Sequence, residues 1–306
     1  MTKFVVSRLF KAVITVWFIV SLVFVCTRMS GDPTLWILPD DAPEAARIEL
    51  RESLGLDRPV TAQYVSYFAD ALRGDMGCSY KYLRPVNEVF AESAWATVSL
   101  GVLAFSLAIL LGVLLGVMAA VHRNSPLDRI TMSATIAGYT VPNFVFGILL
   151  IFLFSLKLRM LPSGGNSTAA HYIMPTLTLM MGPMANIARL TRSSMLDVLR
   201  QDYLECARSK GVPEIVVIFK HSLRNALIPV VTIIGLQMGI IIGGSVVVET
   251  VFAWPGIGSL IVNAAKTRDF PMLQYGILII AAAITLTNTM VDLSYAFLDP
   301  RIRDNF

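Results

Sequence analysis

The chain has 306 residues, of which 55% are hydrophobic and only 15% are charged. An ordinary soluble domain is about 45–50% apolar, so this composition argues against a soluble globular protein and indicates a chain whose solvent is mostly lipid. The net charge of +4 could suit a nucleic-acid binder. The basic residues, however, gather in loops between apolar runs, which is typical of membrane orientation.

Six charge-free runs have about the length of a membrane-spanning helix, which needs about 20 mainly apolar residues. The first resembles a signal peptide because basic residues precede it, but no small-x-small cleavage pattern stands at its outer end, so we expect a retained helix. The six runs are 12–27, 93–121, 130–156, 160–188, 225–248 and 270–291. The sequence therefore predicts an all-α polytopic membrane protein with six transmembrane helices.

The distribution of charge predicts the orientation. Lysine and arginine on short loops are retained on the cytoplasmic side. The segment before the first run, the 122–129 loop, the 189–224 segment and the C-terminal tail all carry lysine or arginine, whereas 30–92 holds more acids than bases. We therefore expect both termini in the cytoplasm. The three cysteines, Cys26, Cys78 and Cys206, fall in different regions and indicate neither a disulfide framework nor a metal pair.

The outside segment 30–92 is too long for a simple connector. It predicts one helix over 42–54, ended by Gly55 and Pro59, and a second over 60–72, ended by the glycine-rich turn 73–77. We expect three regions: an N-terminal transmembrane helix (1–29), an extracytoplasmic helical lobe (30–92) and a core with the other five transmembrane helices (93–306).

The inside segment 189–225 predicts a helical hairpin. From Ser194, apolar residues recur at spacings of three and four until Lys210 and Gly211, which form a helix stop. Pro213 then opens a short second helix that leads into the fifth span. On pattern alone, such a hairpin either docks a partner or lies on the lipid surface.

Small and polar residues in the spans supply candidates for a transport pathway. Glycine recurs every four residues in the second span (Gly112, Gly116) and the fifth (Gly235, Gly239, Gly243), a pattern that allows close helix packing either within the chain or against a partner. Prolines permit kinks, and acids near span ends are expected to be hydrated and to have structural or gating roles. The pathway or gate candidates are Pro142, Asn143, Gly239, Gly243, Glu249 and Asp292.

The hairpin also carries a specific motif. Glu205, Cys206 and Ala207, with Gly211 four positions later, resemble the EAA loop of ABC import permeases, with a cysteine in place of one alanine. The usual ending after the glycine is replaced by the run 221–225, as in the dipeptide and oligopeptide branch. The resemblance continues in order along the chain through the motifs at 31–33, 54–59, 73–75, 189–195, 248–252, 254–258 and 299–303.

Together, the ordered motifs resemble the dipeptide/oligopeptide (and nickel) ABC import permease family, in its DppB/OppB-like subunit. The resemblance implies a type I importer fold and a heterodimer with a second permease (DppC/OppC-like). It further implies one or two cytoplasmic ABC ATPases, an extracytoplasmic solute-binding protein that docks on the lobe, and a place in the bacterial cytoplasmic membrane. The implied ATPase-coupling residues are Glu205, Cys206, Ala207, Gly211, Pro213, His221, Arg224 and Asn225. From its position, Glu205 is expected either to anchor the hairpin by pairing with Arg208 or Arg192, or to form only a solvated i,i+3 pair.

The resemblance implies transport of di- or oligopeptides by alternating access, with nickel, a metallophore or glutathione as alternative cargoes. The chain lacks a G-x-x-x-x-G-K-[ST] phosphate loop, so ATP and Mg²⁺ are expected on partner subunits. No catalytic, cofactor or metal constellation is evident, and His122, His171 and His221 lie far apart. An ion-coupled secondary transporter would need mid-span ionisable residues and internal repeats, which are not evident either.

Overall fold

The computed structural model describes residues 2–39 and 41–298, and in that part of the chain it is helical throughout. The one β pairing among the described residues is an isolated bridge between Cys78 and Pro85. The 299–303 motif and the basic residues Arg301 and Arg303 lie outside the described residues.

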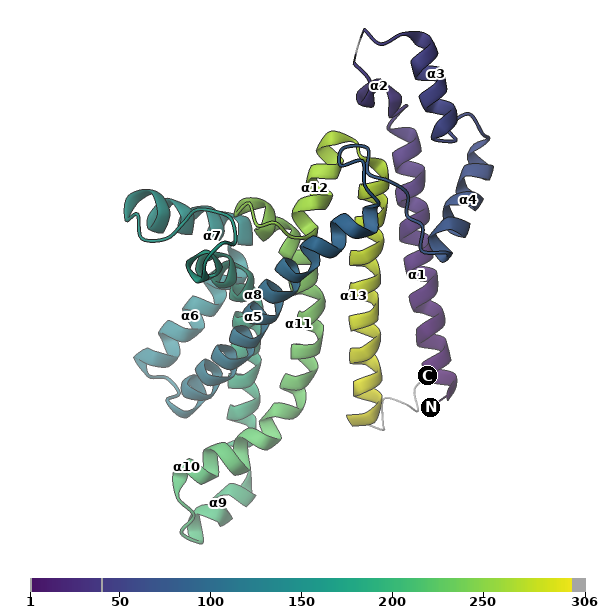
Figure 1. Ribbon diagram of the computed structural model, residues 1–306. Coiled ribbons are helices and arrows are strands. Elements are labelled where there is room, and N and C mark those ends of the chain that lie inside the picture. Colours follow the sequence, from purple (N-terminus) through teal and green to yellow (C-terminus); the bar gives the residue numbers. More distant parts are fainter. Residues whose placement is uncertain (1, 40, 299–306) are drawn as a thin grey trace.

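Five long helices make up most of the bundle: α1 (Thr2–Met29), α5 (Val86–Val121), α8 (Ala169–Val198), α11 (Leu223–Val251) and α13 (Phe270–Leu298). The shortest has 28 residues, or about 42 Å at 1.5 Å per residue, enough to cross a bilayer. Figure 1 shows α13 beside α1, which its contacts confirm, and α8 packs against α5 and α11.

Among the described residues, four helical segments are both long and apolar enough to cross a membrane: Val5–Met29, Val86–Val121, Glu214–Val251 and Phe270–Leu293. A bent pair of helices brings the number to five. The fourth predicted span corresponds to α8, which begins at Ala169 rather than 160 and is less apolar than the others. Thirteen of its 30 residues are buried, so much of its surface contacts protein instead of lipid.

The third predicted span is not a single straight helix. It consists of α6 (Pro126–Thr140), then α7 (Asn143–Leu150) and the π-helical η1 (Ile151–Lys157), and the two parts meet at 107°. The break falls at Val141 and Pro142, because the residue before a proline disfavours the helical conformation. Val141 is indeed extended, with φ −76° and ψ 121°.

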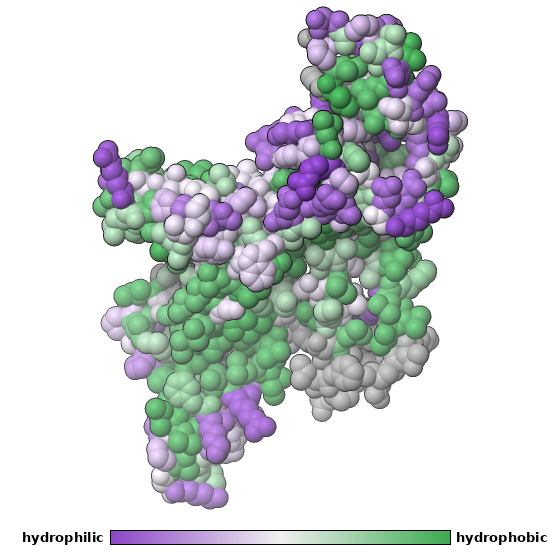
Figure 2. Space-filling model, viewed as in Figure 1, coloured by the Kyte–Doolittle hydropathy of each residue, from purple (hydrophilic) through white to green (hydrophobic). Residues whose placement is uncertain are grey.

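The surface confirms a membrane protein. In Figure 2 an apolar band crosses the middle of the bundle, and polar residues gather above and below it. Within the bundle, the α5 glycines allow close approach to α8: a Cβ on Gly112 would lie 2.9 Å from Ile187, and one on Gly116 only 2.6 Å from the carbonyl oxygen of Ala188. The α5 glycine stripe therefore packs within this chain.

The lobe is helical, as predicted. It contains a short α2 (Thr34–Ile37), then α3 (Glu44–Ser53) and α4 (Val60–Leu72). Aromatic rings attach α4 to α1: Phe24 contacts both Tyr64 and Tyr67, with ring centroids 5.4 and 5.8 Å apart. The Tyr64 hydroxyl also lies 2.7 Å from that of Ser21. The helix of the second span begins at Val86, seven residues before the charge-free run.

The loop that follows α4 within the lobe is hydrogen-bonded to the core. Ser79 donates a hydrogen bond of 2.5 Å to Asp269, and the backbone amide of Lys81 donates one of 3.2 Å to the same carboxylate oxygen. Asp269 lies between α12 (Ile257–Thr267) and α13. The lobe and α12 therefore lie at the same end of the molecule (Figure 1).

Candidate functional site

The inside segment folds as a helical hairpin that projects from the bundle at the end where α1 begins (Figure 1). Its arms are α9 (Asp202–Ser209) and α10 (Glu214–Val216), and α10 continues through the π-helical η2 (Val217–Ser222) into α11. The sequence predicted a first arm starting at Ser194. This start is wrong, because Met195 is fully buried as part of α8 and a break at 199–201 precedes α9.

The reversal between the two arms depends on Gly211. Its φ of +78° lies in the left-handed region that glycine adopts without strain. Its amide donates to the Arg208 carbonyl at 2.9 Å, and the Val212 amide donates to the Ala207 carbonyl at 3.3 Å, so the last carbonyls of α9 are satisfied. Pro213, with φ −56°, then precedes α10.

The hairpin has one buried anchor and an exposed outer surface. Leu204 is fully buried, whereas its neighbours Glu205 and Cys206 are exposed and Ala207 is half-buried. Leu204 is the sole buried residue of α9. The motif residues are therefore available to a partner.

A polar cluster fixes the hairpin to the start of α11. The side-chain amide of Asn225 donates to the Tyr203 hydroxyl at 2.7 Å and to the His221 carbonyl at 3.2 Å. The Tyr203 hydroxyl donates to the same carbonyl at 3.3 Å. The structure thus brings two predicted coupling residues together, with His221 contributing its backbone. Arg224 is exposed beside them.

Neither arginine expected to pair with Glu205 does so. Arg208 binds Glu214 across the turn, with nitrogen to oxygen distances of 2.9 and 3.1 Å, and this pairing raises the pKa of Arg208 above its ordinary value. Arg192 binds Asp128. The expected Glu205 pair is thus wrong, both as an anchor and as a solvated i,i+3 pair, because each arginine has a better-placed carboxylate; Glu205 is exposed.

The salt bridge between Asp128 and Arg192 was missed by sequence reasoning. The guanidinium donates to both carboxylate oxygens, at 2.5 and 2.7 Å, and joins the first turn of α6 to α8. The Asp128 side chain is only 4% exposed. The sequence held one indication that Asp128 stands in the first turn of a helix, because a serine followed by a proline is typical of a helix start. The structure shows this cap: the Ser125 hydroxyl accepts from the Asp128 amide, and Pro126 is the first residue of α6.

Glu249 lies in the protein interior, not in water as its place near a span end suggested. It is 0% exposed. One carboxylate oxygen accepts from the Thr97 hydroxyl of α5 at 2.7 Å, and the other accepts from the Ser259 amide in the first turn of α12 at 3.1 Å. Thr97 in turn accepts from the Ile257 amide at 2.8 Å. Glu249 therefore joins three helices.

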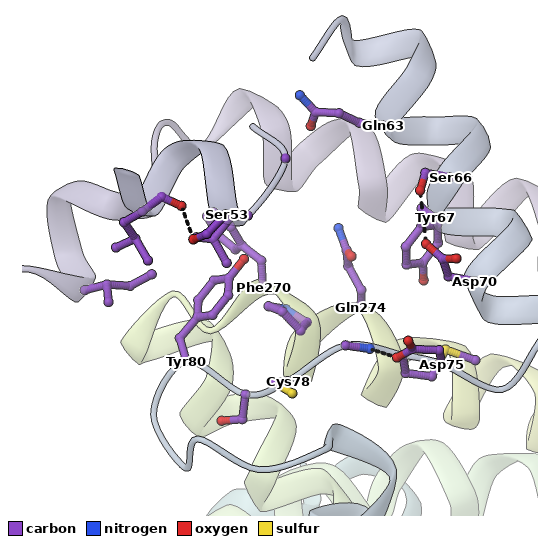
Figure 3. A pocket seen from close by; sticks show the side chains of 18 of the residues that line it. Ser53, Gln63, Ser66, Tyr67, Asp70, Asp75, Cys78, Tyr80, Phe270 and Gln274 are labelled. Carbon is purple, nitrogen blue, oxygen red and sulfur yellow. Dashed lines mark hydrogen bonds between the residues drawn. The ribbon is translucent and has the colours of Figure 1, made fainter. Parts of the chain in front are cut away.

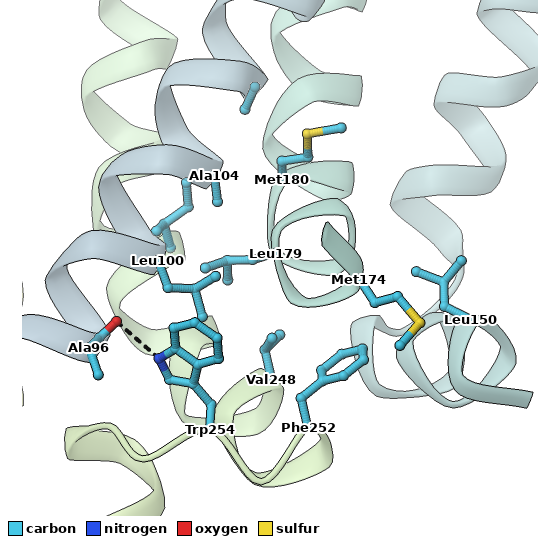
Figure 4. Close-up of a cluster of buried hydrophobic side chains, with 12 residues drawn as sticks. Ala96, Leu100, Ala104, Leu150, Met174, Leu179, Met180, Val248, Phe252 and Trp254 are labelled. Carbon is cyan, nitrogen blue, oxygen red and sulfur yellow. Dashed lines mark hydrogen bonds between the residues drawn. The ribbon is translucent and has the colours of Figure 1, made fainter. Parts of the chain in front are cut away.

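A hydrophobic cluster packs beside this carboxylate. Figure 4 shows the Trp254 indole against Leu100 and Leu179, with its nitrogen donating to the Ala96 carbonyl at 3.0 Å. Trp254 is fully buried. The 254–258 motif that the sequence singled out is thus a packed joint between α11 and α12.

Comparison with known proteins identifies the family. The sequence model of the family described as "Binding-protein-dependent transport system inner membrane component" matches residues 112–304. The sequence model of the N-terminal region of such components matches residues 1–101. The chain belongs to this family. Its relatives include the glutathione transport system permease protein GsiC of Escherichia coli K12, 43% identical over 99% of each chain, and that of Pectobacterium atrosepticum, 41% identical over 99% of each.

Two solved structures share the permease fold. The methionine ABC transporter MetNI, solved in inward-facing conformations, matches with a TM-score of 0.56 over 69% of this chain and 96% of its own, at 17% identity. An amino acid ABC transporter matches with a TM-score of 0.52 over 70% and 94%, also at 17% identity. Because the chain belongs to the family named above, it is a membrane permease subunit of an ABC importer and not itself an enzyme.

Several predicted gate residues of the permease contact its own helices. Asp292 forms a salt bridge of 3.0 Å with Arg8, which joins α13 to α1. A Cβ on Gly239 would lie 3.1 Å from the side-chain oxygen of Asn288 on α13, and one on Gly243 would lie 4.0 Å from Ile284 on the same helix. Close packing within the chain thus explains the glycine at 239, whereas the contact at Gly243 would also admit a side chain, and the assignment of both to the pathway stays a prediction.

The remaining two candidates stand where the third span bends. Pro142 precedes the first residue of α7, Asn143. The Asn143 side-chain nitrogen would lie 3.8 Å from a Cβ on Gly244 of α11. Their assignment to the pathway stays a prediction.

Proposed function

We propose that this permease pairs with a second permease subunit (DppC/OppC-like) and imports short peptides, including glutathione, by alternating access across a bacterial cytoplasmic membrane. Two relatives that match over 99% of both chains are named glutathione transport permeases, and this likeness carries the cargo proposal. Nickel or a metallophore is the alternative cargo.

The cargo test uses the cognate extracytoplasmic binding protein. It is purified from cells without denaturation, and the bound molecules are identified by mass spectrometry, with metal measured in the same sample. A peptide or glutathione supports the proposal. Stoichiometric nickel, free or chelated, would contradict it.

ATP and Mg²⁺ would bind to one or two partner ATPases, whose movement would enter this chain through the hairpin. Three features support this role. The outer surface of α9 is exposed, the turn at Gly211 is fixed by backbone hydrogen bonds, and the second arm continues into α11 as one segment, Glu214–Val251. A force on the hairpin would therefore move a membrane helix directly.

The coupling test is the double variant Gly211→Val, Glu205→Ala. Valine at a φ of +78° costs about 1–3 kcal/mol in local strain, and loss of Glu205 removes an exposed charge from the docking surface. We expect insertion and folding to persist, while cargo-stimulated ATPase activity and uptake are lost together. Import at the wild-type rate by an assembled complex would show that the hairpin is only a surface brace.

Gly74→Val is a matched control for the strain. Gly74 has a φ of +82°, and a Cβ added there, like one added at Gly211, would meet no atom of the described residues within 4 Å. Gly74, however, lies at the lobe end. Its replacement should leave co-purification of the ATPases unchanged.

The lobe would dock the binding protein. Large apolar side chains stand exposed on α4 and on the following loop, with Val65 67%, Leu72 89% and Leu83 83% exposed, near Tyr64 and Tyr80. Photo-crosslinkers at these three exposed positions should capture the binding protein during turnover. If none of them does, the lobe has another role.

A further inference from the structure

A cavity of about 560 Å³, lined by both polar and apolar side chains, lies between the lobe and the core, outside the hairpin and the Glu249 joint. Its walls come from the end of α1, from α3 and α4, from the 75–80 loop and from the start of α13 (Figure 3). Its volume lies within the range of about 300–1,000 Å³ typical of small-molecule sites.

Three buried polar atoms from this wall have no hydrogen-bond partner among the described residues: Arg28 Nε, Gln63 Oε1 and the Tyr67 hydroxyl. The orientation of Gln63 is fixed, because its side-chain nitrogen donates to the Leu56 and Arg58 carbonyls at 3.3 and 2.8 Å. Buried polar groups are normally satisfied. Three around one cavity indicate a polar occupant with both donors and acceptors.

The cavity wall carries charged groups of both signs: Arg28, Arg58, Glu52, Asp70 and Asp75. Burial raises the pKa of Tyr80 to about 12, an effect that the nearby charge of Arg28 opposes, so Tyr80 is a neutral hydrogen-bond donor at physiological pH. In Figure 3, Tyr80 lies on one side of Gln274, and Asp70 and Asp75 lie on the other. Asp70 accepts from Ser66 and pairs with Arg73 at 3.9 Å, and Asp75 accepts from the Gly77 amide. Each carboxylate retains acceptor capacity beyond these contacts.

We propose that this cavity binds a small zwitterion of the peptide class, with its carboxylate at Arg28 and Tyr80 and its ammonium at Asp70 and Asp75. The Tyr67 hydroxyl and Gln63 oxygen would bind its peptide groups. The choice of a peptide rests on the proposed cargo class. The site would hold cargo at the lobe end of the permease, before the pathway.

Cys78 provides a direct reporter because its exposed thiol lines the same cavity. The purified transporter in nanodiscs, without binding protein, is treated with a maleimide, and modification of the Cys78 peptide is followed by mass spectrometry. The probe is S-methylglutathione, a peptide with one ammonium, two carboxylates and no free thiol. We expect it to slow the modification of Cys78 in a saturable way.

Two variants test the assigned contacts. Arg28→Gln removes a charge-assisted hydrogen bond and should raise the half-protecting concentration about tenfold. Tyr67→Phe removes only a hydroxyl and should raise it severalfold, which keeps the test valid if the first variant does not fold. Arg84→Gln is the matched control: it makes the same charge change at the lobe end, on an exposed arginine outside the cavity wall, and should leave protection unchanged.

Absence of protection in the wild type, or protection that is equal in all variants, would overturn the proposal. Protection by glycerophosphoethanolamine but not by S-methylglutathione would also overturn it, because the site would then be one for a lipid headgroup. Uptake of labelled glutathione by the whole system is measured separately. If the wild-type system takes up glutathione but Cys78 is not protected, only this site is refuted. If the wild-type system takes up no peptide, the proposed function is refuted.

Discussion

At the scale of single residues, Glu249 shows how environment decides the role of an acid. An ionisable residue near a membrane is a functional candidate by default. Here its carboxylate accepts from the Ser259 amide at the N-terminus of α12, where the helix dipole favours a negative charge. The side chain thus caps a helix from a neighbouring one, and its first role is structural.

We predict that Glu249→Ala destabilises the permease. It would leave the half-buried Thr97 hydroxyl and Ser259 amide without an acceptor, at about 1–3 kcal/mol each. The measurement is thermal aggregation in detergent, with a clear fall in midpoint expected. Glu92→Ala, at a carboxylate whose side chain is 62% exposed, is the control. Equal midpoints for the two variants would contradict the capping role.

A second residue-scale prediction concerns the lobe at high pH. Burial raises the pKa of Tyr67 to about 12, so the folded lobe holds this proton more tightly than the unfolded chain, whose tyrosine pKa is about 10. Stability of the lobe should therefore be full below about pH 10 and fall as the pH rises towards 12. The titration of Tyr67 is measured as the difference in tyrosinate absorbance between the wild type and Tyr67→Phe. A Tyr67 contribution that titrates near pH 10 would contradict the prediction.

At the scale of elements, the hairpin depends on a single buried contact and a polar cluster. Leu204 alone anchors α9, while the cluster of Tyr203 and Asn225 orients it against α11. Such a small attachment leaves most of the surface for a partner. The continuous second arm supplies the rigidity.

We predict that Leu204→Ala releases α9. Truncating a buried leucine costs about 2–5 kcal/mol, which exceeds what a lone short helix can supply. Hydrogen exchange should become fast over Asp202–Ser209 and stay slow in α8. Ile215→Ala is the control, because this aliphatic residue on the other arm is 66% exposed. Unchanged exchange in Leu204→Ala would show that the polar cluster alone holds the arm.

At the scale of the whole molecule, the apolar band of the helix bundle separates two polar ends. The hairpin and the start of α1 lie at one end of the apolar band, and the lobe, α12 and the proposed peptide cavity lie at the other (Figures 1 and 2). The basic loops favour the hairpin end as cytoplasmic.

Labelling with a membrane-impermeant thiol reagent tests this orientation. Both reporters, Cys78 at the lobe end and Cys206 on the hairpin, are exposed, so access depends on the membrane alone. In intact spheroplasts we expect modification of Cys78 but not of Cys206 until the membrane is permeabilised. Modification of Cys206 alone would reverse the topology.

The sequence by itself determined the features that depend on local chemistry. Apolar runs predicted the long helices, proline and glycine predicted the bounds of α4 and the turn at Gly211, and the ordered motifs indicated the family. Tertiary structure alone decided the contacts between distant segments. Three such contacts join residues more than 40 positions apart. They are the salt bridge of Asp128 with Arg192, the hydrogen bond of Glu249 with Thr97, and the wall of the cavity between the lobe and the core. No spacing in the sequence encodes such contacts, because they depend on how the helices pack.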